Sequence, residues 1–105
     1  MVDRVKVWEK YGEHCAYCGC DISLEEMEVD HLIPKYKDGD DSDENLMPSC
    51  RSCNRWKKTF TLDEFKKELM LQLLRVPRDS AGYRMLVRYG LIEETGKPVK
   101  FYFET

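Results

Sequence analysis

Apolar residues recur with helical spacing in the middle of the chain, directly after a Thr61–Glu64 capping pattern. The residues that follow one another at intervals of three and four are Leu62, Phe65, Leu69 and Leu73. Such intervals place apolar side chains on one face, so they predict a helix over residues 61–76 that ends at Pro77. Asp79 and Ser80 can cap a second short helix that ends at Tyr89 and Gly90.

Alternating patterns predict strands before and after these helices. Residues 27–33 alternate and are β-branched, so they predict a strand that ends at Pro34. Residues 35–45 are rich in Asp, Ser and Gly, as in a loop, and residues 46–48 form a short strand before a short helix over 54–58. Residues 99–103 predict a final strand, with a turn of a hairpin at 94–97. Residues 2–12 suit a short helix that ends at Gly12.

The chain has 105 residues, which fits one small α+β domain and excludes two full ones. No apolar run approaches the roughly 20 residues of a membrane span, so no membrane partner is expected. The first residues alternate charged with apolar side chains and lack the apolar core of a secretory signal. We therefore predict a reducing cytoplasm, where cysteines bind metal more often than they form disulfides.

Two C-x-x-C pairs predict a structural metal site. The four thiols that they offer are those of Cys15, Cys18, Cys50 and Cys53. This spacing lets two turns present their sulfurs to one tetrahedral ion, and the alternative is four unrelated buried cysteines. A rubredoxin-like iron site has the same spacing, but the intervening residues carry no aromatic shell, so we assign Zn²⁺. Cys20 is interpreted as a bystander, with ligation in place of Cys18 as its alternative, and His14 as a surface residue.

Charge is divided unevenly along the chain, whose net charge is −3. Residues 1–30 carry −5 and residues 66–105 carry +3. An acidic loop over residues 38–44 has a solvated surface as its ordinary interpretation. Four basic residues close to Trp56 could bind nucleic-acid phosphates: Arg51, Arg55, Lys57 and Lys58.

Between the cysteine pairs lie Asp30 and His31, and Asn45 and Asn54 follow at 14 and 23 residues beyond the histidine. Alone, these residues indicate little, because a strand histidine is more often a satisfied core residue. The asparagines could be an ordinary turn residue and a helix cap. Glu28 lies on the strand face of Asp30, and its ordinary interpretation is a surface residue.

Together these residues identify a family resemblance. The sequence VDHLIP at 29–34, Asn45-Leu46, and CRSCNRWK at 50–57 resemble the HNH endonucleases of the ββα-metal superfamily, in the variant whose third signature residue is Asn. The resemblance covers about residues 15–58 and leaves an extension over 61–105. It implies a zinc-stabilised ββα domain with flanking helices, from bacteria or their phages, that acts in the bacterial or phage-infected cell.

The resemblance also implies a role for each signature residue. His31 would be the general base that activates water, while Asp30 and Asn54 would hold one Mg²⁺ or Mn²⁺ ion. Asn45 would tie the loop backbone so that His31 is aimed correctly. Lys57 matches the trailing lysine of the family and would contact DNA phosphate. This chain has only Gly39 where the family often has a glycine pair.

The leading interpretation is a metal-dependent DNA endonuclease. Phosphodiester hydrolysis needs an activated water and neutralisation of charge on the phosphoryl group, which a histidine, a metal ion and a basic helix can supply. A non-catalytic zinc ribbon that binds nucleic acid is the main alternative, and a protein-interaction adaptor is a third. The C-terminal residues could extend the DNA footprint, form a dimer surface or complete the core.

Overall fold

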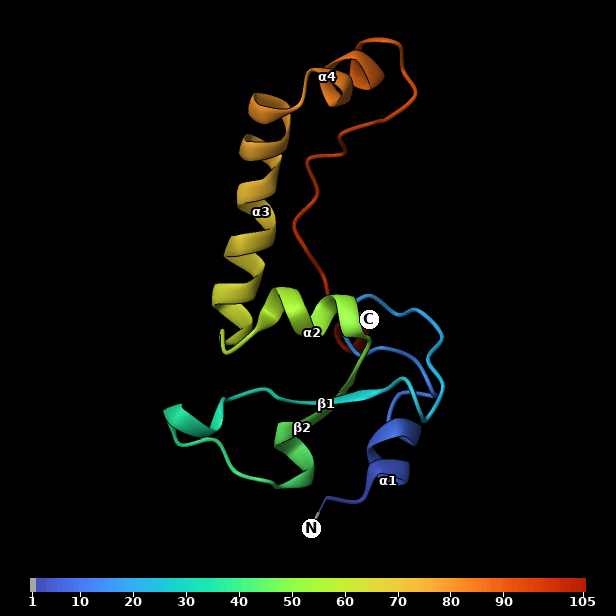
Figure 1. Cartoon of the computed structure of the whole chain (residues 1–105), viewed down its shortest axis with the longest axis vertical. Coiled ribbons are helices and arrows are strands. Elements are labelled where there is room, and N and C mark those ends of the chain that lie inside the picture. The colour runs from blue at the N-terminus through green and yellow to red at the C-terminus, as the bar shows by residue number, and fades with distance from the viewer. Residues whose placement is uncertain (1) are drawn as a thin grey trace. The chain divides into compact units, whose positions relative to one another are not determined.

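The computed structural model describes residues 2–105, and its sheet consists of two short strands (Figure 1). Strand β1 (Glu28–His31) pairs antiparallel with β2 (Leu46–Ser49), so that His31 lies opposite Leu46. Helix α2 (Arg51–Lys57) follows β2 and packs against β1. The ββα order that the sequence predicts is confirmed.

Helix α1 (Arg4–Glu9) precedes the first cysteine pair and packs against β2. The Asp3 side chain caps it by accepting a hydrogen bond from the Lys6 N–H at 3.2 Å. Lys10 then donates from Nζ to the Leu46 carbonyl at 2.9 Å, and Arg4 donates to the Met27 carbonyl at 2.8 Å. These two bonds attach α1 and its C-cap residue to β2 and to the residue that precedes β1.

Helix α3 (Leu62–Asp79) begins with the predicted capping box, because Glu64 accepts from the Thr61 N–H at 2.8 Å. The predicted end at Pro77 is wrong. The proline ring removes only its own hydrogen bond, and the Ser80 N–H still donates to the Val76 carbonyl at 2.9 Å. The helix therefore runs two residues past Pro77. Helix α4 (Ala81–Arg88) follows, capped by the Ser80 hydroxyl as predicted.

The predicted C-terminal strand and hairpin are wrong. Residues 91–101 form no regular element, and Tyr102–Glu104 forms a single 3₁₀ turn, η3. The Tyr102 and Phe103 N–H groups donate to the carbonyls of Tyr17 and Ala16, each at 2.9 Å. Tyr102 and Phe103 therefore satisfy their N–H groups on the first cysteine turn, and within residues 2–105 the alternating residues pair with no strand.

Four aromatic rings form a cluster in the first compact part of the chain: Tyr17, Phe65, Phe101 and Phe103. The Tyr17 ring meets Phe65 and Phe101 edge-on at centroid distances of 5.7 and 5.2 Å. Phe65 and Phe101 stack at 5.2 Å. The cluster joins the first cysteine turn, the start of α3 and the last residues of the chain.

The chain divides into two compact units. One unit runs to Phe65 and includes Lys100–Thr105, whereas the other is Lys66–Val99. The last six residues of the chain thus belong to the first unit. No helix within residues 2–105 has the length and apolar character that crossing a membrane requires.

Candidate active site and metal centre

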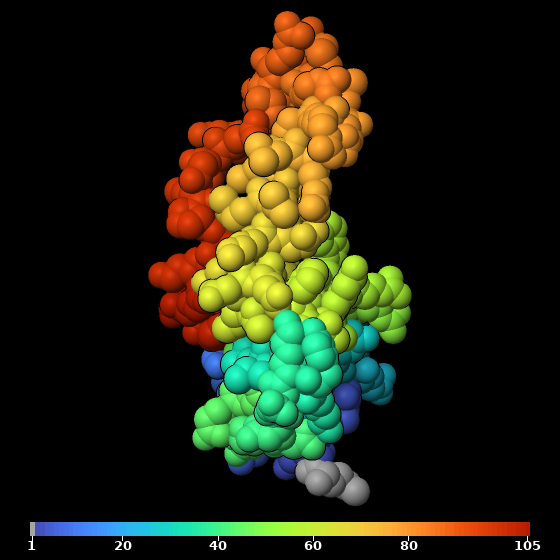
Figure 2. All heavy atoms as spheres, turned by 90° about the vertical axis from the view of Figure 1, so that its left-hand side faces the viewer, coloured from blue at the N-terminus to red at the C-terminus, as the bar shows by residue number. Residues whose placement is uncertain are grey.

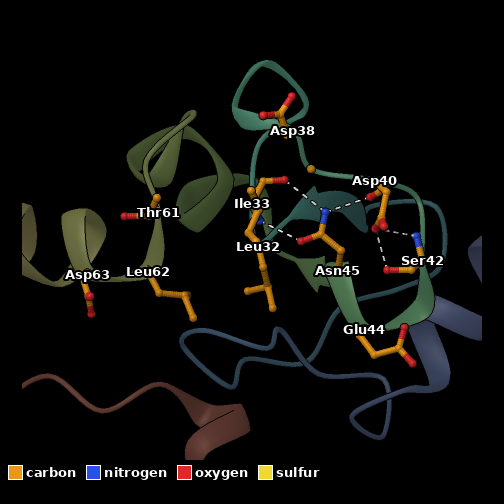
Figure 3. Close-up of a pocket in the computed structure, with 11 residues that line it drawn as sticks. Leu32, Ile33, Asp38, Asp40, Ser42, Glu44, Asn45, Thr61, Leu62 and Asp63 are labelled. Atoms are coloured by element: carbon orange, nitrogen blue, oxygen red, sulfur yellow. Dashed lines mark hydrogen bonds between the residues drawn. The ribbon is translucent and has the colours of Figure 1, made fainter.

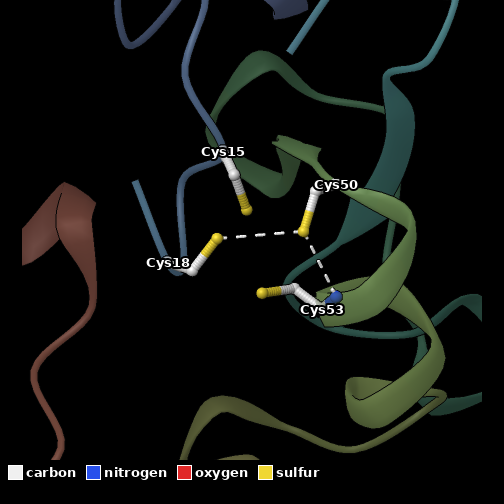
Figure 4. Close-up of side chains that lie close together, drawn as sticks. All are labelled: Cys15, Cys18, Cys50 and Cys53. Carbon is white, nitrogen blue, oxygen red and sulfur yellow. Dashed lines mark hydrogen bonds between the residues drawn. The ribbon is translucent and has the colours of Figure 1, made fainter. Parts of the chain in front are cut away.

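Four cysteines lie close together at the N-terminus of α2 (Figure 4). Cys15 and Cys18 lie in the turn after α1, which Gly19 completes at a φ of 80°. Cys50 caps α2 and Cys53 lies in its first turn. The four sulfur atoms lie within 4.8 Å of one another.

This cluster fits a tetrahedral metal ion. An ion with metal–sulfur bonds of roughly 2.3 Å holds its sulfurs about 3.8 Å apart. The Cys18 and Cys50 sulfurs are 3.8 Å apart. A hydrogen bond from the Cys53 thiol lowers the pKa of Cys15 to about 4, which favours the thiolate that metals bind. Cys20 lies outside the set of four.

Asp30 is buried under α2. Its Oδ2 atom accepts hydrogen bonds from the Tyr17 hydroxyl and from Lys57 Nζ, the latter at 2.9 Å. The side chains of Asp30 and Lys57 are only 6% and 0% exposed. Burial and the charge of Asp30 raise the pKa of Tyr17, so the phenol remains a donor. Asp30 is therefore the centre of a buried polar network.

The position of Lys57 corrects the DNA contact expected of it. Its ammonium also donates to the His31 carbonyl at 2.9 Å, and the side chain is fully buried. A buried cation cannot reach a phosphate on the protein surface. Lys57 instead neutralises Asp30 and joins α2 to the end of β1.

Replacing Lys57 with Met is expected to destabilise the domain by about 3–5 kcal/mol, because it leaves the Asp30 carboxylate buried without its counter-charge. Urea unfolding of Lys57→Met measures this loss, and Lys58→Met is the matched control because Lys58 is exposed. Equal midpoints for the two variants would contradict the importance of the buried pair.

His31 lies at the end of β1, where the loop begins. Successive strand residues project to opposite faces, so Asp30 faces α2 whereas His31 faces the loop. His31 Nε2 lies 2.8 Å from Asp41 Oδ1, and the imidazole is 22% exposed. The hydrogen bond from His31 lowers the pKa of Asp41. His31 is thus held in place and remains accessible.

Asn45 fixes the backbone on both sides of this loop (Figure 3). Its Oδ1 accepts from the Ile33 N–H at 2.8 Å, while Nδ2 donates to the carbonyls of Ile33 and Asp40 at 3.1 and 2.8 Å. The Asn45 carbonyl also accepts from the Leu32 N–H at 2.9 Å. One amide therefore closes the loop immediately after His31.

The loop adopts its turn without a glycine pair. Gly39 is required, because a Cβ there would lie 1.6 Å from the Ile33 carbonyl oxygen. Asp38 occupies the preceding position with a φ of 69°, a left-handed conformation that Asp tolerates better than most residues. The loop lies at the surface of the first unit (teal to green in Figure 2).

A surface pocket lies between this loop and the start of α3 (Figure 3). Four of its lining residues are acidic: Asp38, Asp40, Glu44 and Asp63. His31 is not among its lining residues. An acidic hollow repels phosphate, so this pocket is a poor candidate for a nucleic-acid site.

Side chains with oxygen atoms that could bind a metal ion lie on the β1 face that α2 covers. Asn54 donates from Nδ2 to Glu28 Oε2 at 2.8 Å, and Glu28 Oε1 lies 3.9 Å from Arg51 Nε. Glu28 and Asp30 share this face because they are two residues apart on β1. The structure therefore places Asn54 beside Glu28, and Asp30 beside Lys57.

Helix α2 exposes cationic and aromatic side chains on its outer surface. Arg51 and Arg55 are exposed one turn apart, Trp56 is 47% exposed, and Lys58 is exposed where the helix ends. Three of the four predicted DNA-binding residues are thus accessible.

Most of the residues described above fall within a match to a known protein family. The sequence model of the HNH endonuclease family matches residues 15–60, which include both cysteine pairs, the two strands and α2. Residues 15–60 therefore match an HNH endonuclease domain. The family confirms the resemblance inferred from the motif and indicates a nuclease-type function.

Two much longer proteins are similar to part or most of this chain. The CRISPR-associated endonuclease Cas9 of Corynebacterium diphtheriae is 41% identical over 60 residues, which cover 51% of this chain and 6% of that protein. The crystal structure of the Type II-C Cas9 enzyme from Actinomyces naeslundii has a similar fold, with a TM-score of 0.56 and 23% identity. That match covers 81% of this chain and 10% of the other. The chain therefore spans a small part of each relative.

Two residues that contact the HNH motif, Tyr17 and Asp41, could not be identified from the sequence. Tyr17 lies between two cysteines, and nothing in its sequence position indicates the hydrogen bond to Asp30. Asp41 is one of several acids in a loop of ordinary turn composition. Only the fold of the loop shows which of those acids contacts His31.

Proposed function

We propose that the HNH domain is a divalent-metal-dependent DNA endonuclease. The observation that supports this most is the setting of His31, which is accessible and is held by Asp41 at the end of β1. Lys57 fixes the His31 carbonyl, and Asn45 fixes the backbone two residues later. A general base must be positioned and reachable by water, and His31 meets both conditions.

The oxygen donors near α2 suit a hard divalent cation. Asp30 and Asn54 would hold Mg²⁺ or Mn²⁺, with Glu28 adjacent to Asn54, and oxygen ligands are those that such ions prefer. Lys57 already balances the charge of Asp30, so we expect weak ion binding that substrate phosphate strengthens. The bound ion would neutralise charge on the phosphoryl oxygens and stabilise the departing alkoxide.

The remaining steps belong to side chains of this domain. His31 takes a proton from water, and the water oxygen then attacks the phosphorus of the DNA backbone in line with the bond that breaks. Arg51, Arg55 and Lys58 are exposed on and after α2 and bind flanking phosphates without reading bases. Zn²⁺ at the four cysteines would hold the first turn against α2.

The test is cleavage of supercoiled plasmid DNA by protein whose zinc content has been measured. We expect nicked or linear products only when Mg²⁺ or Mn²⁺ is added. Asn54→Ala should raise the ion concentration for half-maximal cleavage by at least about 10- to 100-fold. Loss of a residue that only orients a metal ligand already costs this much in metal affinity, and Asn54 is proposed as a ligand itself. Ser52→Ala, on an exposed position of the same helix, is the control.

Cleavage that does not depend on the added ion would contradict the proposed mechanism. DNA binding without any cleavage would favour a non-catalytic zinc ribbon instead. Asp30→Ala is a poor test of the metal site, because removing the carboxylate leaves the Lys57 ammonium buried and unpaired.

A further inference from the structure

The acids of the loop over residues 38–44 make specific contacts. Asp43 pairs with Lys6 at 2.6 Å, and Asp40 accepts from the Ser42 hydroxyl at 2.6 Å. Asp41 differs from these two in its partner, because it contacts the histidine of the HNH motif. The loop therefore supplies that ring with a carboxylate.

The contact determines the tautomer of His31. An ionised carboxylate can only accept hydrogen bonds, so the Nε2 atom at 2.8 Å from Asp41 Oδ1 must carry the proton. In the neutral ring the lone pair then lies on Nδ1. Lys35 Nζ lies 3.4 Å from the same Asp41 oxygen and favours its ionised form.

We propose that Asp41 is a positioning residue for His31, which it holds in the tautomer with a free lone pair on Nδ1. The inference rests on the proposed nuclease function. As the water oxygen bonds to phosphorus and the bond to the leaving oxygen breaks, one water proton transfers to Nδ1. The resulting imidazolium lies against Asp41, which balances its positive charge.

The chain contains a matched internal control. His14, the other of its two histidines, has Nε2 2.9 Å from Asp21 Oδ1. The Asp21 side chain is 94% exposed, and this pair lies outside the HNH motif. Asp21→Asn therefore removes the same kind of contact from a histidine that has no proposed role in cleavage.

The experiment measures the nitrogen chemical shifts of both imidazoles by NMR, together with plasmid cleavage and thermal melting. In the wild-type protein we expect His31 to be protonated on Nε2. Asp41→Asn should shift His31 toward a mixture of tautomers and lower cleavage by about 10- to 100-fold, as for other partners that orient a functional histidine. Asp41→Glu, which retains the carboxylate, should restore part of both.

Several outcomes would overturn the inference. An unchanged His31 tautomer in Asp41→Asn refutes the assigned contact, and a changed tautomer with normal cleavage refutes its importance for the reaction. An equal loss of cleavage in Asp21→Asn would show a general effect of removing surface carboxylates. If the wild-type protein never cleaves DNA, the proposed function itself is refuted. The NMR measurement tests the tautomer independently of cleavage, so the two failures can be told apart.

Discussion

His31→Ala is expected to lower DNA cleavage by about 10²- to 10⁴-fold, the usual contribution of a general base. The fold should persist, because the imidazole is partly exposed and Lys57 bonds to the backbone carbonyl of residue 31, which alanine retains. Binding to DNA should change little, since the exposed cations on α2 are untouched. Single-turnover cleavage rates, binding curves and thermal melts of the variant would establish this pattern.

His14→Ala is the control for removal of an imidazole. It should cleave at nearly the wild-type rate, because His14 contacts Asp21 and the Tyr102 ring, away from the HNH residues. If His31→Ala retained the wild-type rate under the same conditions, the mechanism would be wrong. If His31→Ala showed no cooperative melting transition, His31 would instead have a structural role.

Cys15→Ser is expected to abolish the folded state. Structural zinc contributes on the order of 10 kcal/mol to small domains, which equals or exceeds the net stability of most of them. Cys15 is fully buried, so the serine hydroxyl would also lie in a space shaped for a thiolate. Circular dichroism should show loss of the cooperative melt, and metal analysis should show loss of zinc.

Cys20→Ser separates ligation from a general sensitivity of cysteines. Cys20 is exposed and lies outside the cluster of four sulfurs, so this variant should retain its zinc and its melting temperature. A Cys15→Ser protein that melts normally without bound metal would show that the sulfurs are not structural. Unfolding of Cys20→Ser would assign the fifth cysteine to the metal site.

The sequence predicts the parts of this fold that depend on local chemistry. C-x-x-C spacing determines which sulfurs can meet, and the capping residues Thr61 and Ser80 determine where α3 and α4 begin. The order of strand, loop, strand and helix follows from alternation and turn composition. Each of these features depends on residues a few positions apart.

The sequence-based predictions are wrong where the structure depends on contacts between residues far apart in the chain. Residues 99–103 alternate as a strand does, but the Tyr102 and Phe103 N–H groups donate to the first cysteine turn some 85 residues earlier. Lys57 has the sequence context of a phosphate contact, yet Asp30 provides a buried counter-charge for it. Neither partner can be identified from spacing, because both depend on how α2 and the C-terminus pack.

Because the last six residues belong to the first unit, this unit, which contains the HNH residues, is discontinuous in sequence. Phe101 and Phe103 complete the rings around Tyr17, so a chain cut after residue 65 would expose that cluster and weaken the support of the Tyr17 hydroxyl on Asp30. Exchanges between homologous domains must therefore carry both segments together. Residues 66–99, in contrast, lie between these two segments in sequence and form a compact unit of their own.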